Sequence, residues 1–71
     1  MMYPKRIWFD NEQIYLELKD GQIGFLPLRR FSRLYNANKH QRENYTLSPF
    51  GIHWKEIDED LSFEGFFYKE R

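Results

Sequence analysis

The sequence contains no cysteine. Neither a disulfide framework nor a thiolate metal site can therefore form. A chain without cysteine suits a reducing compartment, so we expect a cytoplasmic protein. No run approaches the ~18 apolar residues that cross a membrane, and no signal peptide precedes the first predicted strand. We therefore expect no membrane association.

The chain also lacks the short motifs that carry catalysis. It has no phosphate-binding glycine loop, no nucleophile elbow and no histidine-assisted nucleophile. A calcium loop counted from Asp58 fails, because Phe63 and Lys69 stand where the loop requires glycine and a bidentate glutamate. We expect no cofactor and no enzymatic activity.

What the sequence does contain is a high proportion of aromatic side chains. Its 71 residues include seven Phe, five Tyr and two Trp. They form one predicted domain, residues 1–71, without repeats or linkers. A domain of this size hides only about 60% of its unfolded surface. The aromatic residues offset that shortage, since each can bury roughly 150–250 Å².

The formal net charge of zero conceals an uneven distribution. Positions 21–42 hold five basic residues and no acid, whereas positions 43–64 hold six acids and one base. The two segments can neutralise each other within the fold. Alternatively, they can attract a charged partner or a second copy of the chain.

Alternating apolar residues predict a hairpin in the first half of the chain. Residues 14–18 have the period of a half-buried strand. The Asp20-Gly21 pair suits the two central positions of a type I′ turn. Such a turn would place Leu18 opposite Ile23, and Leu16 opposite Phe25, on one apolar face.

Residues 5–10 extend this hairpin to a three-stranded antiparallel meander through a tight turn at Asn11-Glu12. On the core face, the implied register sets Phe9 opposite Ile14 and Ile7 opposite Leu16. On the other face, it pairs Trp8 with Tyr15 and Arg6 with Glu17. So small a core leaves Trp8 and Tyr15 little to cover them, and a homo-oligomer is one alternative.

An amphipathic helix is predicted over residues 28–36, because Pro27 suits the start of a helix. Its apolar side would cover the sheet, and its outward side would carry three arginines. The apolar side comprises Leu28, Phe31, Leu34 and Tyr35, and the outward side Arg29, Arg30 and Arg33. Asn38 is then placed to cap a short helical turn over residues 39–44.

The last third predicts a short β-hairpin followed by a short C-terminal helix. Residues 45–48 and 51–54 are the expected strands, with Ile52 and Trp54 on one face and His53 on the other. Together with the meander and its amphipathic helix, these elements predict an α+β fold.

The expected C-terminal helix has a cap and a staple. Ser62 can accept the backbone N–H of Gly65, and Leu61 and Phe66 form a hydrophobic staple. The acids at 58–60 and at Glu64 would favour the positive end of the helix dipole.

His53 with one or two of the neighbouring carboxylates could hold zinc or act as a general base. However, no spacing signature links His53 to His40, and the run of acids is typical of a solvated segment. We therefore favour a strand histidine that packs or forms a hydrogen bond. A metal-dependent enzyme remains the least favoured alternative.

The three arginines of the predicted helix form a candidate binding surface. Clustered cations bind phosphates, so nucleic acid is one candidate ligand. An acidic protein partner held by bidentate pairs is another. Because the total charge is zero and no nucleic-acid-binding signature is present, we predict a non-enzymatic protein-interaction module. The expected partner-binding residues are Arg29, Arg30, Arg33, Asp58, Glu59 and Asp60.

The chain resembles a small bacterial family, the domain of unknown function 2442 (DUF2442). The resemblance covers nearly the whole chain, through LKDGQIGFLPL, RLYNAN, QREN and the distinctive run GIHWKEIDEDLSFEGF. Family members often carry proline at the positions of Ser32 and Lys55, and losing the first favours a continuous helix through Ser32. The family motif comprises Gly51, Ile52, His53, Trp54, Asp58, Glu59, Asp60, Leu61, Ser62 and Gly65.

This resemblance implies an α+β fold and carries over no catalytic residue. Members of the family are frequently encoded beside a second small protein, in an arrangement similar to toxin–antitoxin modules, and some are fused to DNA-binding domains. The resemblance therefore implies a binding module, such as the antitoxin-like partner of a co-encoded small protein.

Overall fold

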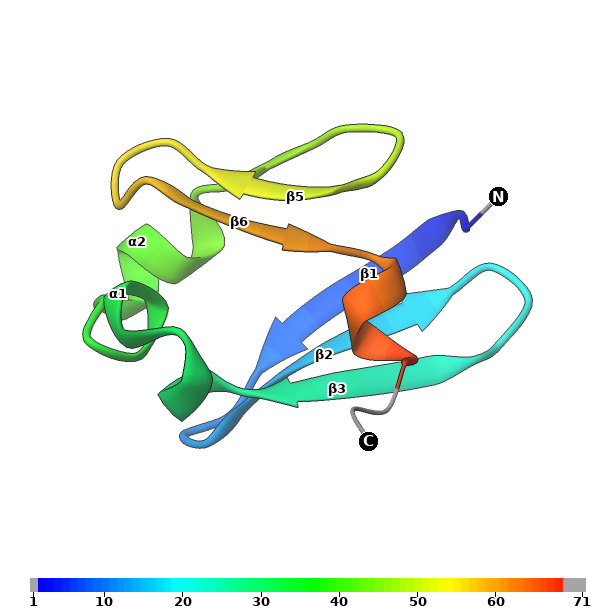
Figure 1. Cartoon of the computed structure of the whole chain (residues 1–71), viewed down its shortest axis with the longest axis horizontal. Coiled ribbons are helices and arrows are strands. Elements are labelled where there is room, and N and C mark those ends of the chain that lie inside the picture. The colour runs from blue at the N-terminus through cyan, green and yellow to red at the C-terminus, as the bar shows by residue number, and fades with distance from the viewer. Residues whose placement is uncertain (1, 69–71) are drawn as a thin grey trace.

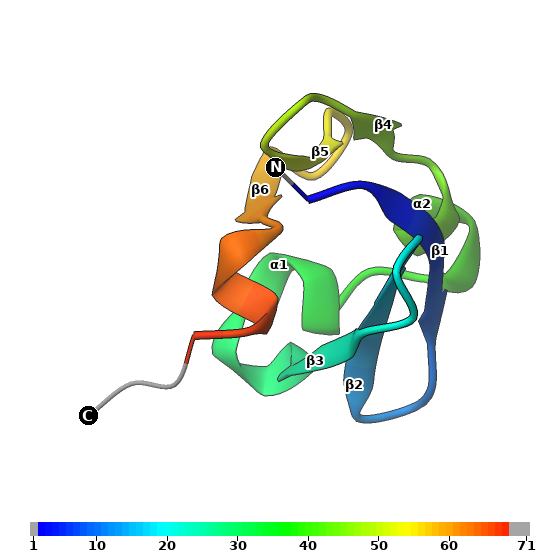
Figure 2. The ribbon, with the colours of Figure 1, turned by 90° about the vertical axis from the view of Figure 1, so that its right-hand side faces the viewer.

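The computed structural model describes residues 2–68, which form two small antiparallel sheets with short helical segments between and beside them (Figure 1). The first sheet has the order β1-β2-β3, and the second has the order β4-β5-β6. Figure 2 shows the two sheets on opposite sides of the molecule. The strands are β1 (Pro4–Phe9), β2 (Gln13–Leu18), β3 (Ile23–Pro27), β4 (Thr46–Leu47), β5 (Gly51–Trp54) and β6 (Glu59–Ser62). The α+β prediction is confirmed.

The register between β1 and β2 is the predicted one. Phe9 pairs with Ile14 and Ile7 with Leu16, while Trp8 pairs with Tyr15 on the other face. The turn that fixes this register is held by Asp10, whose carboxylate accepts the backbone N–H groups of Glu12 and Gln13 at 2.8 and 2.7 Å.

The predicted register between β2 and β3 is wrong by one residue. Leu16 pairs with Gly24, and Tyr15 pairs with Phe25. The reason is the loop: Gly21 has a φ of 95° and Asp20 does not have a positive φ, and Leu18 donates to the carbonyl of Gln22. A three-residue loop with one left-handed glycine therefore replaces the two-residue turn. A one-residue slip moves side chains to the opposite face, so Phe25 lies outside the core.

The predicted continuous helix over residues 28–36 is also wrong. The chain forms a 3₁₀ turn, η1 (Leu28–Arg30), and then one turn of α-helix, α1 (Ser32–Tyr35). Phe31, with φ −126° and ψ 84°, separates them. This break lets Leu28 and Leu34 both reach full burial, whereas Tyr35, expected on the core side, is 38% exposed.

The predicted cap at Asn38 is confirmed. Helix α2 (Lys39–Glu43) begins with a capping box, in which Asn38 accepts from the backbone of Gln41 and Gln41 accepts from the backbone of Asn38. Two hydrogen bonds at this end satisfy backbone donors that a short helix would otherwise leave unpaired.

The predicted hairpin of β4 and β5 is present, but the acidic segment after it is a strand. Residues 59–62 form β6, which pairs with β5, so these acids do not lie at a helix N-terminus as expected. Alternation explains the difference, because Leu61 and Phe63 face the core while Asp60 and Ser62 do not. The expected C-terminal helix is a single 3₁₀ turn, η2 (Glu64–Phe66).

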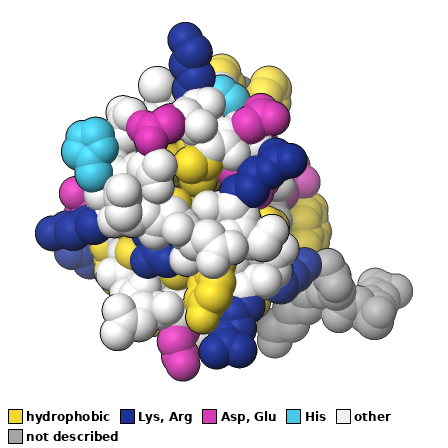
Figure 3. Space-filling model, turned by 90° about the vertical axis from the view of Figure 1, so that its left-hand side faces the viewer, with side chains coloured by type: hydrophobic (Ala, Val, Ile, Leu, Met, Phe, Trp, Pro, Cys, Tyr) yellow, Lys and Arg dark blue, Asp and Glu magenta, His cyan; other side chains and the backbone are white. Residues whose placement is uncertain are grey.

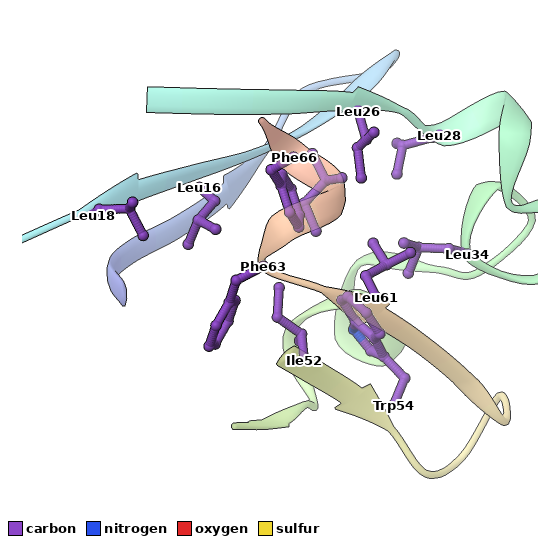
Figure 4. Packing of buried hydrophobic residues seen from close by; sticks show 11 residues of the cluster. Leu16, Leu18, Leu26, Leu28, Leu34, Ile52, Trp54, Leu61, Phe63 and Phe66 are labelled. Carbon is purple, nitrogen blue, oxygen red and sulfur yellow. The ribbon is translucent and has the colours of Figure 1, made fainter. Parts of the chain in front are cut away.

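One apolar core lies between the two sheets, and both sheets contribute to it (Figure 4). Burying side chains from both layers is the usual way for small domains to remove an apolar face from water. The buried side chains are Ile14, Leu16, Leu18, Leu26, Leu28, Leu34, Ile52, Trp54, Leu61, Phe63 and Phe66.

None of the helices within residues 2–68 has both the length and the apolar character of a membrane span.

Candidate protein-interaction surface

The structure brings the predicted arginine cluster and the acidic run at 58–60 into contact where α1 approaches Asp58. The Nη1 atom of Arg33, on α1, donates to the backbone carbonyl of Asp58 at 2.8 Å and lies 3.6 Å from its carboxylate. Asp58 sits in the turn between β5 and β6, with a positive φ of 53°. Because the two side chains are 62% and 88% exposed, this ion pair adds little stability.

The remaining predicted residues flank this contact. Arg29 and Arg30 belong to η1 and are exposed, with their guanidinium groups near the rings of Tyr35 and Phe31, at 5.7 and 5.9 Å. Basic and acidic side chains are interspersed on the end of the molecule that carries the helices (Figure 3). The uneven charge distribution along the sequence is therefore partly neutralised in the folded domain.

A groove of about 270 Å³ runs between η1 and β6. Arg30 and Phe31 form part of one wall, and Asp60 and Ser62 form part of the other. One predicted cation and one predicted carboxylate therefore line the same groove. We call this the β6 groove. Its other lining residues are Leu26, Leu61 and Gly65.

Strand β6 is an edge strand in its sheet. The backbone N–H of Phe63 donates to the carbonyl of Phe50 at 2.9 Å, which makes these two residues a hydrogen-bonded pair. Antiparallel pairs alternate, so the backbone groups of Asp60 and Ser62 point away from β5. The Glu59 carboxylate accepts the N–H of Asp60 at 3.2 Å. Apart from that N–H, the outward backbone groups of Asp60 and Ser62 are the ones that a further strand could bond.

His53 and Asp60 form a cross-strand pair on the outer face of this sheet. Their Nδ1 and Oδ1 atoms lie 2.6 Å apart, as their opposite positions in the register allow. The favoured interpretation of His53 as a hydrogen-bonded strand histidine is confirmed. Within residues 2–68, no three histidine, aspartate or glutamate side chains gather into a group that could hold a metal ion.

Most of the family motif has an architectural role. Ile52, Trp54 and Leu61 are core residues. A Cβ atom added to Gly51 would collide with the backbone carbonyl of Leu61, so this close strand pairing requires glycine. The predicted bond from the Gly65 N–H to the Ser62 hydroxyl is present at 3.1 Å. The charged residues of the motif lie in the turn and in β6.

Arg42 does not belong to the binding surface, although the sequence grouped it with the basic segment. Its guanidinium donates to the carbonyls of Leu34 and Tyr35 at 3.0 and 2.7 Å, and thereby satisfies the end of α1. The bidentate geometry of arginine suits this internal role. The sequence does not show that residue 42 lies next to residue 34 in the fold. The sequence alone therefore could not distinguish Arg42 from the exposed arginines.

These features define a small α+β domain with two facing sheets and an open, charged groove beside an edge strand. The chain belongs to the family described as Protein of unknown function (DUF2442), whose sequence profile matches residues 4–71. No curated protein matches the chain, and no solved structure does.

Proposed function

We propose that this domain is a non-enzymatic protein-interaction module that binds its partner at the β6 groove. The observation that carries the proposal is the contact between Arg33 and Asp58, because it unites the two charged segments next to β6, an edge strand of its sheet. Of the expected partner-binding residues, Arg30 and Asp60 line the groove. The others, Arg29, Arg33, Asp58 and Glu59, would contact the partner outside it.

The kind of ligand follows from the groove. An extended segment of the partner would add to β6 through backbone hydrogen bonds, which supply affinity. Carboxylates of the partner would pair with the exposed arginines, which supply specificity and speed association. The family resemblance adds the partner's source: a small protein encoded beside this chain, with this domain in the antitoxin-like role.

Nucleic acid is the alternative ligand for the same arginines, but the surface favours protein. Phosphate contacts require an excess of cations. Here Asp58 accepts from Arg33, and Asp60 lines the groove beside Arg30. A phosphate backbone along the groove would therefore meet carboxylates as well as guanidinium groups.

Co-purification with the product of the neighbouring gene tests the proposal. The variant Arg29→Ala/Arg30→Ala/Arg33→Ala should lose capture of that product. The matched control, Lys5→Ala/Lys19→Ala/Lys39→Ala, removes the same charge from other exposed positions and should retain it. Far-UV circular dichroism confirms that both variants are folded. Undiminished capture by the arginine variant would contradict the proposal.

Salt dependence separates the two ligand classes. A labelled single-stranded or double-stranded oligonucleotide bound through the arginines would lose affinity steeply as salt rises. We expect no binding of either oligonucleotide even at low salt. Tight binding at low salt that disappears in the arginine variant would assign the surface to nucleic acid instead.

A further inference from the structure

The outer face of the first sheet carries an aromatic row that crosses all three strands. The rings of Trp8 and Tyr15 stack with centroids 5.2 Å apart and planes 8° from parallel. Phe25 continues the row, with its centroid 6.3 Å from that of Tyr15. Phe25 joins the row as a direct result of the shifted register between β2 and β3.

The row is exposed at Phe25, half-buried at Trp8 and Tyr15, and held in place. Phe25 is 56% exposed, and its neighbour Ile23 is 55% exposed. The Tyr15 hydroxyl donates to the Asp10 carboxylate at 2.5 Å, and the Arg6 guanidinium lies 4.2 Å from the centre of the Trp8 ring. Rings that are already fixed lose less conformational entropy when a partner covers them.

Two further rows flank the aromatic one. The register places Arg6, Glu17 and Ile23 side by side on one flank. It places Asp10, Gln13 and Pro27 side by side on the other, because Asp10 donates to the Gln13 carbonyl and Gln13 pairs with Pro27. Each strand of this face, β1 together with Asp10 just after it, therefore carries one residue of each flanking row, with an aromatic side chain between the two.

We propose that this face binds a second copy of the chain, sheet against sheet, around a two-fold axis parallel to the aromatic row. Such an axis reverses the strand direction and keeps the order across the sheet. It sets each aromatic side chain against its own equivalent. It also sets Arg6 against Asp10 of the other copy, Glu17 against Gln13, and Ile23 against Pro27.

The complementarity of the two flanking rows favours a second copy of the chain as the partner of this face. Under the two-fold axis, cation meets anion, polar side chain meets polar side chain, and apolar meets apolar, as a self-complementary interface requires. A single-stranded nucleic acid would also stack on the rings. However, the register places two carboxylates, Asp10 and Glu17, on this face beside Arg6, and carboxylates do not complement phosphates.

The dimer leaves the β6 groove open, because none of the residues that line the groove belongs to the aromatic row or to its two flanking rows. The proposal therefore goes beyond the proposed function and stands independently of it. A dimer would present two grooves to a partner, and a partner with two matching segments would gain avidity.

Sedimentation analysis over a concentration series tests the dimer. We expect the mass of the wild-type protein to rise towards twice that of the monomer. Phe25→Asp should weaken self-association at least about tenfold, since it places a charge within the aromatic row, opposite the same charge of the other copy. Phe50→Asp changes a side chain that is 75% exposed in the loop between β4 and β5 and should behave as wild type. A wild-type protein that remains monomeric up to about 1 mM would overturn the proposal.

Cross-linking tests the symmetry. Because the chain has no cysteine, Phe25→Cys introduces a single thiol, which the two-fold axis places against its equivalent. A short bismaleimide should join two Phe25→Cys chains efficiently, and two Phe50→Cys chains poorly. Equal cross-linking of both variants would overturn the two-fold arrangement, as would a monomer that binds a single-stranded oligonucleotide through Phe25.

Discussion

The indole Nε1 of Trp54 donates to the backbone carbonyl of Arg42 at 2.8 Å. Trp54 comes from the second sheet and is fully buried, whereas Arg42 comes from α2 and also holds the end of α1. This single bond therefore connects the second sheet to both helical segments. The ring of Tyr45 meets Trp54 edge-on, with centroids 6.0 Å apart, and completes the junction.

Replacing Trp54 with Phe should destabilise the domain by about 1–3 kcal/mol, because it leaves a part-buried carbonyl without its donor. Urea unfolding followed by circular dichroism measures the loss. Trp8→Phe is the matched control, since it keeps a stacking ring on the outer face. Equal effects of the two substitutions would mean that the Trp54 bond contributes nothing specific.

Gly24→Ala should cost about 1–3 kcal/mol through overpacking. A Cβ atom at this position would lie 2.6 Å from the backbone carbonyl of Phe66 and 2.9 Å from the Phe67 ring, and a backbone atom cannot swing aside. Gly21→Asn is the control, because the loop there is open and asparagine tolerates a positive φ. A thermal melt of Gly24→Ala equal to that of wild type would show that η2 can move off β3.

The N-cap of η2 is Phe63 rather than the expected Ser62, so Ser62→Ala should cost only the hydrogen bond that the Gly65 N–H donates to its hydroxyl, about 0.5–1.5 kcal/mol. Ser32→Ala, at an exposed position at the start of α1, serves for comparison and should cost less. Chemical unfolding of both variants measures the difference. An unchanged midpoint for Ser62→Ala would mean that water replaces the hydroxyl at no cost.

The turn at Asp10 should make stability depend on pH in the acid range. Hydrogen bonds from the Tyr15 hydroxyl and from the backbone of Glu12 and Gln13 hold the pKa of Asp10 below its ordinary value of 3.8. Because the folded state has the lower pKa, ionised Asp10 favours folding. That contribution is present above pH 3.8 and is lost as the pH falls through the depressed pKa.

Asp10→Asn keeps an acceptor in the turn but cannot titrate. The stability difference between wild type and this variant should be constant near neutrality and should shrink on acidification. The same hydrogen bond raises the pKa of Tyr15 above 10.0, so the pKa of Tyr15 should fall in the variant. Thermal melts across the acid range and tyrosine titration by NMR measure the two effects. A difference that does not change with pH would contradict the assignment.

The sequence alone was sufficient to predict the elements that short-range interactions determine. The β1–β2 register follows from alternation and a two-residue turn, and the α2 cap follows from Asn38 and Gln41. The β2–β3 register does not, because Asp20-Gly21 fits both a two-residue and a three-residue loop, which differ by one residue. That one residue decides whether Phe25 packs inside or lies outside.

The helix break and the third strand of the second sheet depend on tertiary structure. Residues 28–35 have helical periodicity, but the core accepts Leu28 and Leu34 only if the chain breaks at Phe31. Glu59 and Asp60 disfavour a strand on propensity alone, yet pairing with β5 overrides that preference. The charged surface was predicted as two separate segments, and the fold alone could bring Arg33 to Asp58.

The division of the core between two sheets that are far apart in the sequence has a consequence during synthesis. Ile14, Leu16 and Leu18 emerge from the ribosome early, whereas the strands that cover them begin at residue 51. The nascent chain therefore carries a bare apolar surface until its last third has been translated. Over that interval the first sheet is open to chaperones and to mispairing with other growing chains.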